Sequence, residues 1–256
     1  MLLSIFITHY NRPNALKKCL QIIHSINWPV SYEVVVSDDG SNNENLKVIE
    51  NENIDKLLLA KSNQGLAANL NKGIKSCKGD FLLYCQEDAI ISQDIDKILL
   101  ECLEILKRGK LDMIRLRANY KFPHLIKISE NINKIPRFSF KNFNVNTFQY
   151  SDNPFITTKT FFEEFGYFLE GTSGPYGETE YAIRILNTNA KIGITKKKYA
   201  LWQKEVKSVI NTQIPIKKRK GSKQFWRFAR ALRQHFEWIM YSKSNRKLLT
   251  YKNRRK

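Results

Sequence analysis

The sequence predicts an α/β protein with an open, mostly parallel sheet flanked by helices, and three observations support this. Short apolar runs alternate with stretches of helical periodicity four times between residues 1 and 110. Polar clusters directly follow three of these runs. The chain has 256 residues, 42% of them hydrophobic, which suits one large domain whose core needs no disulfides.

Strands and helices follow one another regularly in the first half. The run at residues 2–7 is apolar throughout, as expected of a strand covered on both faces, and Pro13 then opens a helix. Right-handed crossovers bring the carboxyl ends of parallel strands to one edge, so we expect the polar clusters at 8–12, 38–41 and 86–88 to meet there. The other expected elements are strands at 32–36, 56–59 and 81–85 and helices at 45–53, 65–76 and 94–108.

The second half is less regular, and residues 119–150 show no clear period. The glycine-rich stretch 170–177 is interpreted as a loop, after which Glu178 or Thr179 opens a helix through Ile185. The other expected elements are strands at 113–117 and 155–158, an edge strand at 191–195, and helices at 159–165 and 222–241.

Positive charge is concentrated at the C-terminal end. The chain has 43 Lys and Arg against 24 Asp and Glu, a formal net charge of +19. Residues 217–256 hold 15 of these bases and a single acid, Glu237, which gives that region +14. The remaining 28 bases and 23 acids leave residues 1–216 at +5, ordinary for a globular domain. We therefore predict one domain over 1–215 and a basic tail over 216–256.

The tail has three interpretations: a solvated tail, a nucleic-acid patch, or a helix lying on an anionic membrane surface. The predicted helix at 222–241 favours the third, because an apolar stripe lies beside Lys and Arg. A nucleic-acid partner is not expected, since the domain before the tail has the character of an enzyme. The stripe comprises Phe225, Phe228, Ala229, Leu232, Phe236 and Ile239.

Several classes of protein are excluded by composition. The four cysteines form no CxxC pair and lie in apolar contexts, which indicates reduced thiols in a cytoplasmic protein. The four histidines have no zinc-ligand spacing. The apolar start is short and has no basic flank, so we interpret it as a strand and not a signal peptide, and no apolar run approaches the ~20 residues of a membrane span.

Acidic side chains at strand ends suit a particular chemistry. Glu87 and Asp88 are adjacent carboxylates that could hold a hard divalent cation on a diphosphate. Asp38 could accept hydrogen bonds from a nucleobase or a ribose hydroxyl. An acidic strand end alone is equally typical of a turn or a helix cap, but three polar strand ends in chain order favour a site.

The order of these motifs resembles that of the family 2 glycosyltransferases of GT-A fold. The match covers residues 2–90 well and continues more loosely to about residue 200. The motifs are Thr8-His9-Tyr10-Asn11-Arg12-Pro13, Val34-Val35-Val36-Ser37-Asp38-Asp39-Gly40-Ser41, Asn63-Gln64-Gly65 with Asn71 and Gly73, and Gly79-Asp80-Phe81-Leu82-Leu83-Tyr84-Cys85-Gln86-Glu87-Asp88.

The resemblance implies that residues 1–110 bind a nucleotide-sugar, and that Asp88 and Glu87 hold Mg²⁺ or Mn²⁺. Two positions depart from the family pattern: Gln86 replaces the first Asp of the usual Asp-x-Asp motif, and Leu70 stands where many relatives carry an Arg. The residues implied to bind the donor are Thr8, Tyr10, Arg12, Asp38, Asp39, Asn63 and Gly65.

The resemblance also implies that residues 111–215 bind the acceptor and supply a catalytic base. The segment 177–184 is similar to the acidic loop-to-helix segment of inverting members. Alignment on Arg184 favours Glu178 as the base, whereas alignment on the expected helix start favours Glu180, which ranks marginally first. Residues two apart on a helix do not face the same way, and the choice stays open.

We therefore expect an inverting glycosyltransferase that moves a sugar from a UDP- or GDP-sugar to a hydroxyl of a bacterial surface glycan. The expected acceptor is a lipid-linked lipopolysaccharide, lipooligosaccharide or capsule precursor, and the expected location is the inner face of the cell membrane. One alternative is a catalytically impaired module that binds or assembles partners, because Gln86 departs from the metal motif. The other is a nucleic-acid-binding protein acting through its tail.

Overall fold

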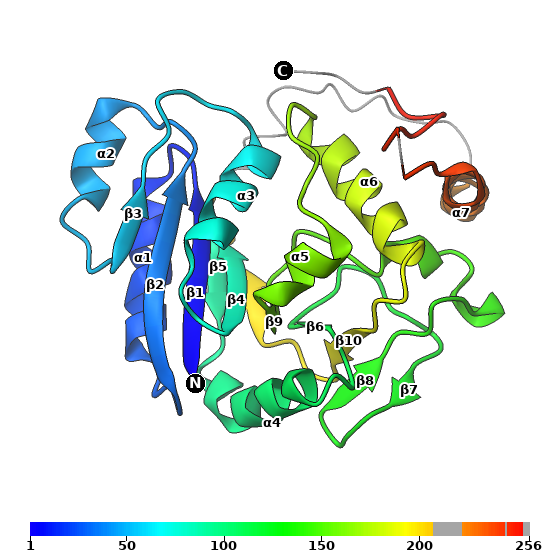
Figure 1. Ribbon diagram of the computed structural model, residues 1–256, viewed down its shortest axis with the longest axis horizontal. Helices are drawn as coiled ribbons and strands as arrows, with labels where there is room; N and C mark the ends of the chain where they lie inside the picture. Colours follow the sequence, from blue (N-terminus) through cyan, green and yellow to red (C-terminus); the bar gives the residue numbers. More distant parts are fainter. Residues whose placement is uncertain (207–221, 244, 253–256) are drawn as a thin grey trace.

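The computed structural model describes residues 1–206, 222–243 and 245–252 and shows one large mixed sheet with helices on both faces (Figure 1). Helices α1, α2 and α4 cover one face, and α3, α5 and α6 cover the other. The helices are α1 (Pro13–Ser25), α2 (Asn43–Ile49), α3 (Leu66–Ser76), α4 (Asp96–Lys107), α5 (Thr160–Phe165), α6 (Gly174–Leu186) and α7 (Lys223–Met240). Three 3₁₀ turns are η1 (Gln93–Ile95), η2 (Phe140–Asn142) and η3 (Asn146–Phe148).

The main sheet has the order β3-β2-β1-β4-β9-β6-β10-β8-β7. Strand β1 pairs in parallel with both β2 and β4, as predicted, whereas β9 runs antiparallel between β4 and β6. These strands are β1 (Leu2–His9), β2 (Ser31–Asp38), β3 (Lys56–Leu58), β4 (Phe81–Gln86), β6 (Met113–Arg115), β7 (Ile126–Lys127), β8 (Ile132–Lys134), β9 (Phe155–Thr158) and β10 (Ile192–Thr195).

The core has two layers, one on each side of the sheet. Alternate residues of a strand point to opposite faces, so Ile5 packs against the α1 side and Phe6 against the α3 side. Both are completely buried, which explains why β1 is apolar at every position. The α/β class and the mostly parallel sheet of the first half are therefore confirmed.

Two predicted features of the second half are wrong. The strand expected at an edge, β10, lies inside the sheet between β6 and β8, because the unpredicted β7–β8 pair covers it. Helix α6 begins at Gly174 and not at residue 178 or 179. Pro175 occupies the first turn, where its missing N–H costs nothing, and Thr179 lies inside the helix with its hydroxyl bonded to the carbonyl of Pro175.

Strands β5 (Ala89–Ile91) and β11 (Ala200–Trp202) form a separate two-stranded sheet. Gln203, just after β11, reinforces this pair. Its backbone N–H donates to the carbonyl of Asp88 at 2.8 Å, and its amide donates to the carbonyls of Ala15 and Glu87. Hydrogen bonds from Gln203, more than a hundred positions later in the chain, thus hold the acidic segment that follows β4.

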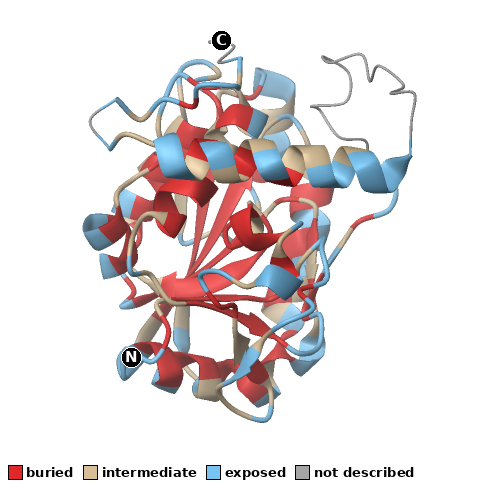
Figure 2. Ribbon diagram, turned by 90° about the vertical axis from the view of Figure 1, so that its right-hand side faces the viewer, coloured by how far each residue is buried: buried red, intermediate tan, exposed pale blue. Residues whose placement is uncertain are grey.

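Helix α7 packs on the rest of the protein beside α6 and η3 (Figures 1 and 2). A small cluster of Tyr176, Ile183 and Leu248 is buried beneath the segment that follows α7. The basic stretches 217–221 and 253–256 and the predicted boundary at 215–216 lie outside the described residues. Among the described helices, none is sufficiently long and apolar to cross a bilayer.

Candidate active site

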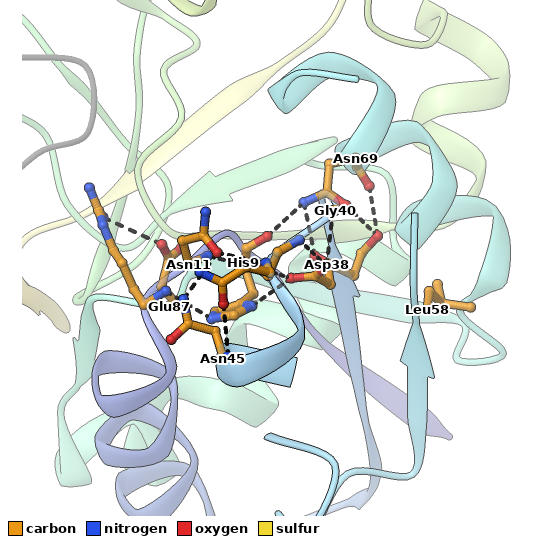
Figure 3. Close-up of polar contacts among 12 residues, drawn as sticks. His9, Asn11, Asp38, Gly40, Asn45, Leu58, Asn69 and Glu87 are labelled. Atoms are coloured by element: carbon orange, nitrogen blue, oxygen red, sulfur yellow. Dashed lines mark hydrogen bonds and ion pairs between the residues drawn. The ribbon is translucent and has the colours of Figure 1, made fainter. Parts of the chain in front are cut away.

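The carboxyl ends of β2, β1 and β4 lie side by side, as the sequence predicted. His9 is opposite Asp38 across one strand pair, and Thr8 is opposite Gln86 across the other. The predicted polar clusters therefore form one continuous polar edge above the sheet. Figure 3 shows this edge, with His9, Asp38 and Glu87 drawn from three neighbouring strand ends.

The carboxylate of Asp38 is completely buried and holds its own loop together. Oδ1 accepts the backbone N–H groups of Gly40 and Ser41 at 2.9 and 2.8 Å, and Oδ2 accepts the Ser41 hydroxyl and, at 2.8 Å, His9 Nδ1 (Figure 3). Burial alone would raise the pKa of Asp38, but the hydrogen bonds from His9 and Ser41 outweigh it and hold the pKa below its ordinary range.

His9 and Asn11 extend this network to the loop after β1. The backbone N–H of Arg12 donates to His9 Nε2 at 3.2 Å, so the ring carries its proton on Nδ1, toward Asp38. Asn11 adopts a left-handed conformation with φ 51°, and its side-chain oxygen accepts the backbone N–H of Asn42. This bond joins the loops after β1 and β2.

Asp39 fixes the start of α3. Its two carboxylate oxygens accept the backbone N–H groups of Gln64 and Gly65 at 2.8 and 3.0 Å. Gly65 has φ 94°, which explains the glycine at that turn. Asn63 lies half-buried in the same loop. Asp39 therefore holds the loop that contains Asn63 and Gly65 through hydrogen bonds inside the protein.

The remaining predicted donor residues lie at the end of β1. Thr8 is buried and its hydroxyl lies 3.2 Å from the hydroxyl of Tyr84, while Tyr10 is half-buried in the following loop. Arg12 Nη1 lies 3.4 Å from Glu87 Oε1 and 3.3 Å from Asp88 Oδ2. The structure therefore brings Arg12 together with the acidic pair.

Glu178 lies in a small pocket between α3, the start of α6 and Asp152. Its lining includes apolar residues of α3, Phe168 and the two acids Asp152 and Glu178. The backbone N–H of Asp152 donates to Glu178 Oε1 at 3.2 Å. Burial raises the pKa of Glu178, and the hydrogen bond from Asp152 and the charge of Arg115 partly offset it. A carboxylate with a raised pKa in a pocket suits a general base.

Glu180 points away from this pocket. It is completely buried and accepts two hydrogen bonds from the guanidinium of Arg184 and one from the hydroxyl of Tyr241 at 2.8 Å. All its partners are therefore internal. The geometry favours Glu178, which the sequence ranked second, as the base.

The family follows from a comparison of the sequence with protein-family models. The model described as Glycosyl transferase family 2 matches residues 4–168, well over half of the chain. The chain belongs to glycosyl transferase family 2. The protein is thus a glycosyltransferase, and the resemblance stated from the strand-end motifs is confirmed.

Two curated relatives each match about a third of this glycosyltransferase. An uncharacterized glycosyltransferase, YfnE of Bacillus subtilis, is 28% identical over 95 residues, which are 36% of this chain and 24% of the relative. An N-acetylglucosaminyltransferase of Bradyrhizobium is 30% identical over 98 residues, 36% of this chain and 64% of the relative. The matched regions thus span about a quarter and just under two thirds of these relatives.

Solved structures show the same GT-A fold. S. aureus TarS 1–349 in complex with UDP-GlcNAc matches with a TM-score of 0.63 at 17% identity, covering 96% of this chain and 74% of the other. The mannosyltransferase PcManGT of Pyrobaculum calidifontis, in complex with GDP-Man and Mn²⁺, matches with a TM-score of 0.57 at 16% identity, covering 94% and 64%. These likenesses confirm the fold.

The acidic pair of this glycosyltransferase has the chemistry of a partial metal site. Oδ1 of Asp88 is buried and has no hydrogen-bond partner among the described residues. Burial raises the pKa of Glu87 to about 8, despite the opposing charge of Arg12, and burial likewise raises the pKa of Asp88. The described residues contain no group of three or more His, Cys, Asp or Glu suited to a metal. Two carboxylates fit an ion that takes its other ligands from a diphosphate and water.

Two residues that interact with Glu178 were not predicted as site residues. Asp152 precedes β9, and its side chain accepts the hydroxyl of Tyr150 at 2.8 Å. Arg115 is buried at the end of β6, where desolvation lowers its pKa to about 10. Arg115 stands in an apolar strand and Asp152 in an aperiodic stretch. A charged residue within an apolar strand was the one sequence signal for these two residues, and it indicated Arg115 and not Asp152.

Proposed function

We propose that this glycosyltransferase moves one sugar from a nucleotide-diphosphate donor, a UDP- or GDP-sugar, to an acceptor hydroxyl with inversion at the anomeric carbon. The observation that carries the proposal is the position of Glu178 in a pocket that Leu66 of α3 also lines, one residue after Gly65, which is bonded to Asp39. Structures of relatives binding UDP-GlcNAc and GDP-Man support a donor of this class.

The strand-end residues bind the donor, and Glu178 in the pocket acts on the acceptor. Thr8, Tyr10 and Arg12 contact the donor, and Asp38 and Asp39 hold the surrounding loops in shape. Asp88 and Glu87 would hold Mg²⁺ or Mn²⁺, which supplies charge neutralisation for the departing diphosphate. The complex of PcManGT with Mn²⁺ supports this assignment.

Glu178 accepts the proton of the acceptor hydroxyl as its oxygen attacks the anomeric carbon. Oε1 is held by the N–H of Asp152, while Oε2 accepts no hydrogen bond from the described residues and is available to the acceptor. Leu66, Leu70 and Phe168 add apolar surface to the lining of the pocket. A single displacement of this kind inverts the configuration.

We further propose that the acceptor is a lipid-linked precursor of a bacterial surface glycan, at the inner face of the cell membrane. The N-acetylglucosaminyltransferase among the relatives, and the basic residues of 217–256, support a glycan acceptor near an anionic surface. No nucleic-acid partner is proposed.

A donor screen tests this function. Purified protein is incubated with a panel of UDP- and GDP-sugars, with Mn²⁺ or with chelator, and hydrolysis of the donor is measured. We expect one donor to be hydrolysed, and Asp88→Asn to lower the rate by about 10²-fold or more. The matched control, Glu164→Gln on the exposed side of α5, should keep the wild-type rate.

Two results of the screen would contradict the proposal. Full activity in Asp88→Asn would show that the acidic pair is not part of the site. Donor binding without turnover, measured by calorimetry, would favour the catalytically impaired module.

A further inference from the structure

The most buried positions of α7 are small or polar, and Trp238 packs beside them on the side that faces the protein. Ala231, Gln234 and Glu237 are each at most 4% exposed. Gln234 accepts the hydroxyl of Thr147 at 2.9 Å, and the carboxylate of Glu237 accepts the backbone N–H groups of Leu249 and Thr250. These bonds fix how α7 is rotated about its axis.

The opposite side of α7 is apolar and exposed. We name this side the α7 apolar face; its residues are 47–79% exposed, and at 100° per residue they form one stripe directly opposite Ala231 and Gln234. Figure 2 shows exposed and buried positions alternating along the helix that crosses the front of the molecule. The face comprises Phe225, Phe228, Leu232, Phe236, Ile239 and Met240.

A second segment adds apolar surface beside this helix. Phe140 is 85% exposed and contacts Phe138, with ring centroids 5.0 Å apart. Phe138 in turn lies 6.3 Å from the ring of Trp238 on α7. A helix of a globular protein normally turns its apolar stripe inward, so an outward stripe of this size indicates an interaction surface.

The positive charge of residues 217–256 favours an anionic partner for the α7 apolar face. The one acid of residues 217–256, Glu237, is buried and bonded to backbone N–H groups, so this region presents no acidic side chain at the surface. Exposed bases lie on α7 and in the segment that follows it. A second copy of the chain would place +14 against +14, whereas an anionic bilayer complements both the charge and the apolar stripe. The exposed bases are Lys223, Arg227, Lys243, Lys247 and Lys252.

We propose that the α7 apolar face inserts into the interface of an anionic membrane while α7 remains docked on the enzyme. This deepens, and rests on, the proposed membrane location. Tyr241 bonds to Glu180, and Asn187 donates to the carbonyl of Trp238 at 3.4 Å, so α6 connects α7 to the pocket. Membrane binding through this face therefore holds Glu178 in one orientation relative to the bilayer.

Vesicle binding by the full chain tests the proposal. Sedimentation is compared for vesicles of phosphatidylcholine alone and of phosphatidylcholine with phosphatidylglycerol. We expect binding to the anionic vesicles that weakens with salt. Combining Leu232→Ser, Phe236→Ser and Ile239→Ser should reduce partitioning by about tenfold or more, because three exposed apolar side chains are lost. The combined control Val48→Ser, Leu59→Ser and Leu100→Ser removes similarly exposed side chains elsewhere and should bind as wild type.

A fluorescent label then tests the orientation. The native cysteines are all buried, so Ile239→Cys and Leu100→Cys can each be labelled selectively with an environment-sensitive dye. We expect a blue shift on anionic vesicles for the label at 239 and none at 100. Shifts at both positions would contradict insertion through α7.

Four further outcomes would overturn the proposal. The first is equal vesicle binding by the triple variant and wild type, and the second is an equal loss of vesicle binding in the combined control. The third is a label at 239 that is already in an apolar environment without vesicles, and the fourth is a dimer that the triple variant disrupts while vesicles do not bind. The third would mean that the chain covers its own helix, and the fourth that a second copy does. Donor hydrolysis in solution is measured separately and should be unchanged in the triple variant. Vesicle binding by wild type without any hydrolysis would overturn the proposed function and leave this inference standing.

Discussion

The backbone N–H of Asp152 donates a hydrogen bond to Oε1 of Glu178 at 3.2 Å, and both carboxyl groups line one pocket. Burial, and the charge of Glu178, raise the pKa of Asp152 well above its usual range. Burial also raises the pKa of Glu178. The two acids therefore compete for a single negative charge at the place where we expect the acceptor hydroxyl to lose its proton.

This pair predicts the pH dependence of transfer. A base must be deprotonated, so kcat/KM should rise with pH through a limb that lies above the ordinary range of glutamate. Glu178→Gln should remove this limb. Asp152→Asn keeps the backbone N–H and mimics the protonated acid that burial favours at Asp152, so its limb should stay at the wild-type position. The measurement is kcat/KM against pH for wild type and both variants. A limb that persists in Glu178→Gln would mean that another group is the base.

A second prediction separates the two candidate bases. Glu178→Gln should lower kcat by about 10²–10⁴-fold. It should not reduce the free energy of unfolding, because burial already disfavours the charged form of Glu178. Glu180→Gln should instead lower the free energy of unfolding by about 3 kcal/mol, because Arg184 keeps its charge in a buried site.

Urea unfolding and donor turnover, measured on both variants, check this assignment. If Glu180→Gln folds as stably as wild type but is inactive, the base is Glu180, and the pocket has another role.

A third prediction concerns Asp38. Its folded-state pKa is depressed, so its contribution to stability is complete above the unfolded-state pKa and is lost as the pH falls through the folded-state pKa. Asp38→Asn should therefore lower the free energy of unfolding by about 3 kcal/mol at neutral pH. The difference from wild type should shrink below about pH 4.

The measurement is urea unfolding at a series of pH values. Asp94→Asn, at an exposed position, is the control and should match wild type within about 0.5 kcal/mol throughout. A constant difference between Asp38→Asn and wild type at every pH would show that Asp38 is not the titrating group.

The strand-end half of the site was predictable because its signals are local. An apolar run ending in a polar cluster places Thr8, Asp38 and Asp88 at one edge once the crossover rule is applied. The internal use of Asp38 was not predictable, since its carboxylate accepts three donors from its own loop and one from His9 at the end of β1. The sequence alone assigned that carboxylate to the ligand.

The other half depends on long-range contacts that leave no periodic signal. Asp152 reaches Glu178 across 26 positions, and Gln203 reaches Ala15 across 188. The start of α6 was hidden because Gly174 and Pro175 are typical loop residues, although Pro is well suited to a first helical turn. That error shifted the expected helix start and so favoured Glu180 over Glu178.

The burial of Tyr176, Ile183 and Leu248 against one another has a practical consequence for deletion experiments. A protein shortened at residue 216 would lose Leu248, exposing Tyr176 and Ile183 to water. It would also lose the Tyr241 hydroxyl that Glu180 accepts. Inactivity of such a shortened protein would report a damaged fold, not a lost partner. Point substitutions on the outward side of α7 are therefore the informative way to separate attachment from catalysis.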